Sequence, residues 1–179
     1  MSWKYGVLLI SIPALFVFHA SGHQIDKDKS DTQTVFGLKK EVERPVRIPA
    51  SVLLALRSDA DVVRCLKPKK SPAEIPASWF AASEVRLNEA EEIDLVVQPK
   101  DSCLLGAKVG PFWVFRRTQK GYELALKTSA QSIEILESKT TGYRDILSVQ
   151  PTPVRVISVT FKFDGKKYVG QSEKSHPMF

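Results

Sequence analysis

The sequence predicts an α+β fold in which an N-terminal helical segment packs on a mainly antiparallel β meander. Three observations lead to this prediction. An apolar pattern with the period of an α-helix lies at residues 48–66. Short runs rich in β-branched and aromatic residues fill the chain from Trp79 onward. The connections between these runs are short, which favours strands that pair with their neighbours in the sequence.

The chain of 179 residues begins with the features of a secretory signal peptide. Lys4 provides the positive start, and an apolar run, Val7 to Phe18, follows it. This run is shorter than the roughly 20 residues that a membrane-spanning helix needs. We therefore expect residues 1–22 to be removed after Gly22, or after Ala20, and the protein to be periplasmic or secreted with no transmembrane segment. The alternative is an uncleaved N-terminal anchor.

The remaining chain divides into three segments by composition. Residues 23–46 are polar and mixed in charge, so they bury too little apolar surface to offset the entropy of ordering, and they predict a flexible leader. Residues 47–170 have the length of a single globular α+β domain. The last residues, 171–179, are expected to form a disordered tail.

The helical pattern covers "IPASVLLALRSDADVVRCL". Pro49 suits the first turn of a helix, where its missing N–H is no loss. Val52, Leu53 and Leu56 recur on one face, which should pack on the sheet. A break near Arg57 would divide the segment into two helices, with the second capped at its start. The proline-containing stretch "KPKKSPAEIPAS" that follows predicts an exposed basic loop.

From Trp79 the sequence predicts about seven or eight short strands. The turn sequences "TQKG" and "DG" fit hairpins. The run "YELALKT" alternates between apolar and polar residues, as expected for a strand with one covered face. The candidate strands are "WFAASEVRL", "IDLVVQ", "PFWVFRR", "GYELALKT", "SIEILES", "RDILSVQ", "VRVISVTFKFD" and "KKYVG".

A weak internal similarity joins the two halves of this region. Asp94 begins "DLVV" and Asp145 begins "DILSV", and in each half an aromatic strand, a glycine turn and a tyrosine follow. This order is compatible with two blade-like repeats. Chance similarity between ordinary hairpins is the alternative.

These residues also resemble a family of exported bacterial proteins of unassigned function. The family carries "GYRDI", here Gly142 to Ile146, and an aromatic "DG" hairpin, here Phe161 to Tyr168. The resemblance covers roughly Trp79 to Tyr168. In this family the segment before "DLVV" is similar to the aspartate-rich calcium turn of FG-GAP and integrin-like propeller repeats. The resemblance implies a fold more than an activity.

The corresponding stretch here, "RLNEAEEIDLVV", keeps few of the calcium ligands. Asn88 and Asp94 match the pattern, whereas Arg86 and Ala90 replace aspartates and Glu91 replaces the turn glycine. A calcium ion takes about six to eight oxygen ligands. We therefore expect a structural turn in which Asp94 braces the start of a strand, with Asn88 and Asp94 as a degenerate candidate metal pair. No cofactor is predicted.

Cys65 and Cys103 are the two cysteines of the chain. Export to an oxidising compartment predicts that they form a disulfide. Such a bridge would close a loop of about 40 residues and stabilise the fold by roughly 4 kcal/mol in the chain-entropy model.

The histidines argue against several classes of enzyme. All three, His19, His23 and His176, lie near the ends of the chain. Catalytic triads and most zinc sites need an imidazole, so these classes are disfavoured. Glu84, Asp94 and Asp145 could support carboxylate chemistry, but their spacing selects no pair. We therefore predict no catalytic residue and expect an exported, non-enzymatic binding or cell-envelope-associated domain.

The net charge of +6 favours an anionic envelope polymer or an exported protein as the partner. Because the chain carries a signal peptide, intracellular nucleic acid is not expected. One alternative is a protein inhibitor of an exported enzyme, similar to lysozyme inhibitors, that binds through Gly106 to Trp113. A further alternative is a carboxylate-dependent hydrolase. The candidate binding surface consists of Lys67, Lys69, Lys70, Trp113, Arg116, Arg117, Lys166 and Lys167.

Overall fold

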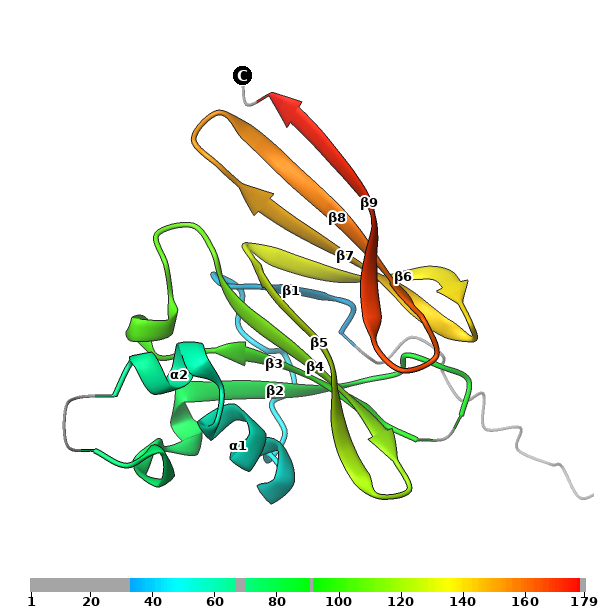
Figure 1. Cartoon of the computed structure of the whole chain (residues 1–179). Coiled ribbons are helices and arrows are strands. Elements are labelled where there is room, and N and C mark those ends of the chain that lie inside the picture. Colours follow the sequence, from blue (N-terminus) through cyan, green and yellow to red (C-terminus); the bar gives the residue numbers. More distant parts are fainter. Residues whose placement is uncertain (1–32, 67–69, 91, 178–179) are drawn as a thin grey trace, which may run out of the picture. The chain divides into compact units, whose positions relative to one another are not determined.

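The computed structural model describes residues 33–66, 70–90 and 92–177. The predicted signal peptide lies outside these residues, as do Lys67 and Lys69 of the candidate binding surface. Nine strands of the described part form two antiparallel sheets, as Figure 1 shows. The broad prediction of an α+β chain dominated by antiparallel strands is thus confirmed. No helix in the described ranges is long and apolar enough to cross a membrane.

The first sheet contains four strands in sequential order, each paired with the next. Every residue of its second strand, β3, is buried, because both faces of this sheet are covered. The strands are β2 (Phe80–Val85), β3 (Asp94–Pro99), β4 (Gly110–Thr118) and β5 (Gly121–Ala130).

A short helical segment covers one face of the first sheet (Figure 1). Val52, Leu56 and Val62 of this segment belong to a core cluster with Trp113 and Phe115 of β4. The segment contains α1 (Ala50–Arg57) and α2 (Ala60–Arg64), and three single-turn 3-10 helices lie nearby, η1 (Pro72–Glu74), η2 (Ala77–Trp79) and η3 (Ser102–Leu104).

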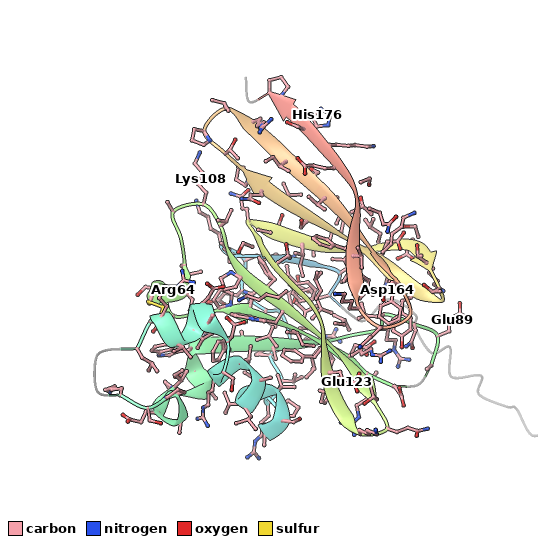
Figure 2. All side chains as sticks on the ribbon, in the orientation of Figure 1. Arg64, Glu89, Lys108, Glu123, Asp164 and His176 are labelled. Atoms are coloured by element: carbon pink, nitrogen blue, oxygen red, sulfur yellow. A yellow bond between two sulfur atoms is a disulfide. The ribbon has the colours of Figure 1, made fainter. Side chains whose placement is uncertain are left out.

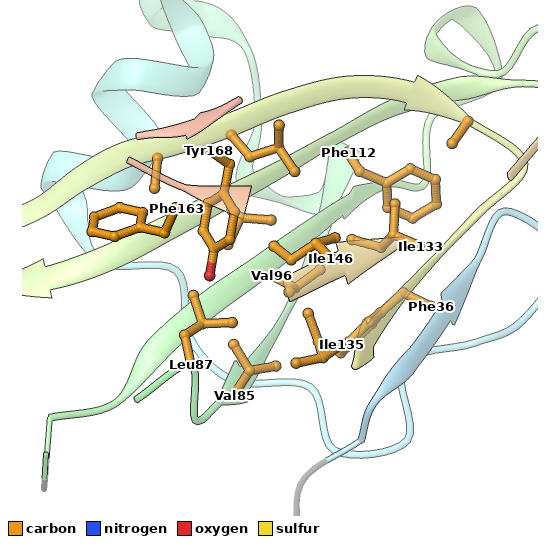
Figure 3. Packing of buried hydrophobic residues seen from close by; sticks show 14 residues of the cluster. Phe36, Val85, Leu87, Val96, Phe112, Ile133, Ile135, Ile146, Phe163 and Tyr168 are labelled. Atoms are coloured by element: carbon orange, nitrogen blue, oxygen red, sulfur yellow. The ribbon is translucent and has the colours of Figure 1, made fainter. Parts of the chain in front are cut away.

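The second sheet covers the other face of the first. Figure 3 shows the apolar side chains between the sheets, among them Phe112 and Val96 from the first and Ile133, Ile146 and Phe163 from the second. The sheet has the order β1-β6-β7-β8-β9. Its strands are β1 (Val35–Gly37), β6 (Ser132–Thr140), β7 (Tyr143–Pro151), β8 (Arg155–Phe163) and β9 (Tyr168–Pro177).

The eight candidate strands correspond to β2–β9, but the predicted single meander is divided between two sheets, and β1 is an additional strand. The described chain passes from one sheet to the other at Gln131, between β5 and β6. Ala130 still pairs with Gly110 of β4, whereas the Gln131 N–H donates to the Val149 carbonyl of β7 at 2.8 Å. One residue is therefore enough to change sheets, and no proline or glycine marks the place.

Two expected segment boundaries also differ from the structure. Part of the expected flexible leader forms β1, because Phe36 is fully buried in the core and the strand pairs with β6. The expected disordered tail, 171–179, contributes to β9, which pairs with β8 as far as Pro177 opposite Arg155. The pairing of β1 with β6 joins distant parts of the chain, whereas β9 extends the predicted hairpin with β8 beyond its expected end.

Candidate functional site

Asp94, the first residue of β3, joins three segments of the chain through its carboxylate. One oxygen accepts the Leu87 N–H at 3.2 Å, and the other accepts the Arg117 N–H of β4 at 2.7 Å. The side chain is 1% exposed. Burial raises the pKa of Asp94 to about 6, although both hydrogen bonds act in the opposite direction. The carboxylate therefore braces Leu87, which follows β2, against Arg117 near the end of β4.

The other degenerate metal candidate also faces a backbone amide. Asn88 Oδ1 accepts the Ala90 N–H at 2.9 Å, closing a local turn. Glu89 of the same loop pairs with Lys139 of β6 at 2.5 Å. In the described part of the loop, these side chains hold the turn in place through their own hydrogen bonds and ion pair.

Two tyrosines make the same contact in the two sheets. The Tyr122 hydroxyl on β5 donates to the Ile93 carbonyl at 3.2 Å, one residue before Asp94. The Tyr168 hydroxyl on β9 donates to the Arg144 carbonyl at 2.8 Å, one residue before Asp145. Each tyrosine thus ties the last strand of its sheet to the residue that precedes a buried aspartate.

Asp145 is 4% exposed and only partly satisfied by hydrogen bonds. Its Oδ2 accepts the Ser138 hydroxyl at 2.8 Å, and its Oδ1 is buried without a partner.

Burial raises the pKa of Tyr168, and the nearby charge of Asp94 raises it further, so the tyrosine remains a hydrogen-bond donor. Of the three carboxylates considered for hydrolysis, only Glu84 is exposed. The geometry of Asp94 and Asp145 is that of structural braces.

Trp113 does not belong to the candidate binding surface. It is 1% exposed and lies in the core beneath the helical segment, where its Nε1–H donates to Asp59 Oδ2 at 3.1 Å. The first six residues of β4 are all buried, so its sequence has no polar alternation that would show which way the tryptophan points. The prediction of Trp113 as a surface residue is therefore corrected.

The other described basic residues of the candidate binding surface lie in two separate regions of the structure. Lys70 is exposed beside η1, close to the helical segment. Lys166 and Lys167 lie in the turn between β8 and β9, at a distant end of the sheets in Figure 1. The candidate surface is therefore not continuous over the described residues.

Arg116 of β4 lies near the β8–β9 turn, whereas Arg117, the next residue, points to the opposite face of the strand. The Arg116 guanidinium lies 5.4 Å from the centre of the Phe163 ring, and Phe163 is the last residue of β8. The Arg117 guanidinium lies 4.9 Å from the centre of the Tyr122 ring and is exposed to solvent. We call Arg116, Arg117, Lys166 and Lys167 the basic end. In Figure 2, Asp164 of the turn is well separated from Lys108 and Arg64.

Several acidic side chains near the basic end are already engaged. Glu123 pairs with Arg116 at 3.1 Å, and Glu137 pairs with Arg144 at 2.5 Å. Asp164 Oδ1 accepts the backbone N–H groups of Lys166 and Lys167, each at 2.8 Å. Over the described ranges, the side chains of Arg117, Lys166 and Lys167 have no acidic partner. These three exposed cations are thus available to a ligand.

The loop considered for enzyme inhibition is less accessible than its sequence indicates. Phe112 and Trp113 are buried, and the Gly106 N–H donates to the Val109 carbonyl at 2.9 Å. Only the turn around Lys108 extends into solvent.

One buried polar residue was not recognised from the sequence. Gln98 is 4% exposed, and its Oε1 has no hydrogen-bond partner. In the sequence, Gln98 stands out only as a polar residue directly after the apolar run "DLVV". This feature is too common to indicate a site.

Comparison of this chain with protein-family models, with curated proteins and with solved structures gives no significant match.

Proposed function

We propose that the protein is an exported, non-enzymatic binding domain whose basic end contacts an anionic polymer. The observation that carries this proposal is the set of three exposed cations, Arg117, Lys166 and Lys167, beside acidic groups that are engaged elsewhere. Export is supported by the N-terminal signal pattern. The disulfide between Cys65 and Cys103, with a Cα–Cα distance of 5.8 Å, is consistent with an oxidising compartment.

Exposed cations without acidic partners favour polyanions for an electrostatic reason. Binding displaces the counterions condensed on the polymer, so the affinity should fall steeply as salt is added. The planar guanidinium of Arg117 is held against Tyr122 and can approach an anionic group with little loss of side-chain entropy. The surface should therefore recognise charge density more than sequence or stereochemistry.

The first prediction concerns binding to dextran sulfate, with neutral dextran as the matched polymer. We expect the mature protein to bind fluorescent dextran sulfate in an anisotropy titration and not to bind dextran. The triple variant R117Q/K166Q/K167Q should bind dextran sulfate at least about tenfold more weakly at low salt, because three contacts with the polymer are lost.

The control variant K70Q/K108Q/K174Q removes the same charge from exposed lysines outside the basic end. It should change the affinity by less than about twofold if location matters more than net charge. Equal losses of affinity for dextran sulfate in the two triple variants would show that binding depends only on the overall charge. The basic end would then not be the binding surface.

We further infer that the two four-stranded halves, β2–β5 and β6–β9, are related blade-like units. Three features support this inference. In each half an aspartate lies on the second strand, and a tyrosine hydroxyl on the fourth strand donates to the carbonyl before it. The pairing of the third and fourth strands shifts register before Phe115 in one half and before Phe161 in the other. The hairpin glycines Gly121 and Gly165 both have positive φ.

A further inference from the structure

A groove lies on the far side of β3 from the helical segment, where β3 ends. It has a volume of about 280 Å³. Leu38 and Val42, in the segment that follows β1, contribute apolar walls together with Leu105, which follows η3. The groove is thus built from three separate parts of the chain, and its size suits a small ligand or a single terminal residue.

Gln98 of β3 lines this groove and is oriented by a hydrogen bond. Its Nε2–H donates to the Lys40 carbonyl at 2.9 Å. Only the amide nitrogen can donate to a carbonyl, so this contact fixes which end of the amide is oxygen. The Oε1 atom is left buried and without a partner. A buried acceptor without a donor is unfavourable, which makes this atom a natural contact for a ligand N–H.

The charged side chains around the groove leave a positive excess. Lys39 and Lys100 line it, are exposed, and have no acidic partner in the described segments. Lys40 is paired with Glu43 at 2.9 Å, and Glu41 is the acidic residue of the lining. Two unpaired lysines against one glutamate favour an anionic ligand.

We propose that this groove binds a small carboxylic acid that carries an N–H donor on a branched apolar body, as in an N-acylated amino acid. The N–H donates to Gln98 Oε1, the carboxylate lies near Lys39 and Lys100, and the apolar body packs against Leu38 and Leu105. The C-terminal residue of a peptide offers the same three groups. This site is separate from the basic end, and it does not depend on polymer binding.

The test uses N-acetyl-leucine as the probe, titrated into the isotope-labelled protein up to about 10 mM with detection by NMR. Two matched compounds each lack one group: 4-methylpentanoate has no N–H, and N-acetyl-leucinamide has no carboxylate. We expect N-acetyl-leucine to bind at least about tenfold more tightly than either, with the largest amide shifts at Leu38, Gln98 and Leu105. Acetyl-Ala-Ala-Leu distinguishes a peptide C-terminus from a free small acid as the natural ligand. Tighter binding than that of N-acetyl-leucine indicates a peptide C-terminus, and weaker binding indicates a free small acid.

The variant K39Q/K100Q changes two exposed side chains and should leave the fold intact. It should weaken binding of N-acetyl-leucine about tenfold and leave binding of N-acetyl-leucinamide unchanged. The control variant K166Q/K167Q should have no effect on either compound. Equal binding of the three leucine-like compounds, an unchanged affinity in K39Q/K100Q, or no binding of N-acetyl-leucine would overturn the proposal. Loss of dextran sulfate binding would bear on the basic end alone.

Discussion

Asp94 shows how a single carboxylate can hold separate segments of backbone together. Its two carboxylate oxygens accept backbone N–H groups from Leu87 and Arg117, on either side of it in space. In a calcium-binding turn a cation draws oxygen atoms together, whereas here one carboxylate draws two N–H groups together. The loop can then keep its course without a metal ion.

The pKa of Asp94 predicts a specific dependence of stability on pH. It is raised from its ordinary value of 3.8 to about 6, so the folded protein binds more protons than the unfolded chain between these values. The free energy of unfolding should therefore fall as the pH rises through this window, by up to about 3 kcal/mol, and should change no further above it. Urea denaturation at a series of pH values measures this fall.

The variant D94N removes the ionisable group and supplies the control. It should lack the fall, because an amide has no proton to lose in this pH range. Parallel pH profiles for the native protein and D94N would show that Asp94 is not the group responsible.

At the scale of single residues, the sequence indicated the position of Asp94 better than its partners. A polar loop followed by "DLVV" indicates a residue at the start of a strand. Arg117 lies on another strand, and nothing local in the sequence connects the two residues. Gln98 was missed for the same reason, since its partner is the Lys40 carbonyl in a segment expected to be flexible.

At the scale of elements, Asp59 fastens the short helix α2 to the first sheet. One oxygen caps the helix by accepting the Asp61 N–H at 2.9 Å, and the other accepts the Trp113 Nε1–H at 3.1 Å. Lys127 of β5 pairs with Asp59 at 2.8 Å. Burial alone would raise the pKa of Asp59, but the hydrogen bonds from Lys127 and Trp113 lower it overall.

We predict that D59A destabilises the protein by about 2–3 kcal/mol, because the helix loses its cap and a buried tryptophan N–H loses its acceptor. The variant D59N keeps a good capping side chain and should cost clearly less. Urea denaturation measures both values, and near-ultraviolet circular dichroism reports on Trp113. Equal losses for D59A and D59N would indicate that the charge of Asp59, and not the cap, stabilises the helix.

The β6–β7 hairpin depends on left-handed backbone at two consecutive residues. Thr141 has φ of 50° and Gly142 has φ of 80°, and the Thr141 hydroxyl donates to the Phe163 carbonyl. A Cβ at Gly142 would meet no atom within 4 Å, so only the backbone conformation penalises a side chain there. We expect G142A to lower the free energy of unfolding by about 1 kcal/mol.

The matched control is G37A, because Gly37 has no positive φ and a Cβ there would make ordinary contacts at 3.7 Å and beyond. Its effect on the urea midpoint should be smaller than that of G142A. A larger effect for G37A would mean that β1 limits the stability and that the hairpin does not.

At the scale of the whole molecule, the local pairings could be predicted from the sequence and the division into two sheets could not. Hairpins such as β8–β9 join neighbours, and their glycine turns are visible in the sequence. The pairing of Val35 with Glu134 joins distant parts of the chain. No proline or glycine marks the change of sheet at Gln131, and the only local sign is that the apolar residues change from even positions in β5 to odd positions in β6.

The position of the candidate surface follows from this division. Arg116 on β4 and Phe163 on β8 belong to different sheets, and their contact brings Arg116 close to the β8–β9 turn, which carries Lys166 and Lys167. The sequence gives the basic residues but not this proximity. Likewise, the sequence shows that Trp113 lies close to the arginines along the chain, but it does not show that the side chain points into the core.

The central claim, that the basic end binds an anionic polymer, is tested most directly by mapping where a short sulfated oligosaccharide binds. The amide shifts of the mature, isotope-labelled protein would be recorded by NMR during its addition, at low salt and at physiological salt. We predict that the largest shifts occur at residues 116–118 and 164–168 and that they diminish as salt is added. Shifts that are absent, that persist unchanged in salt, or that centre on Lys70 and Lys108 would contradict the claim.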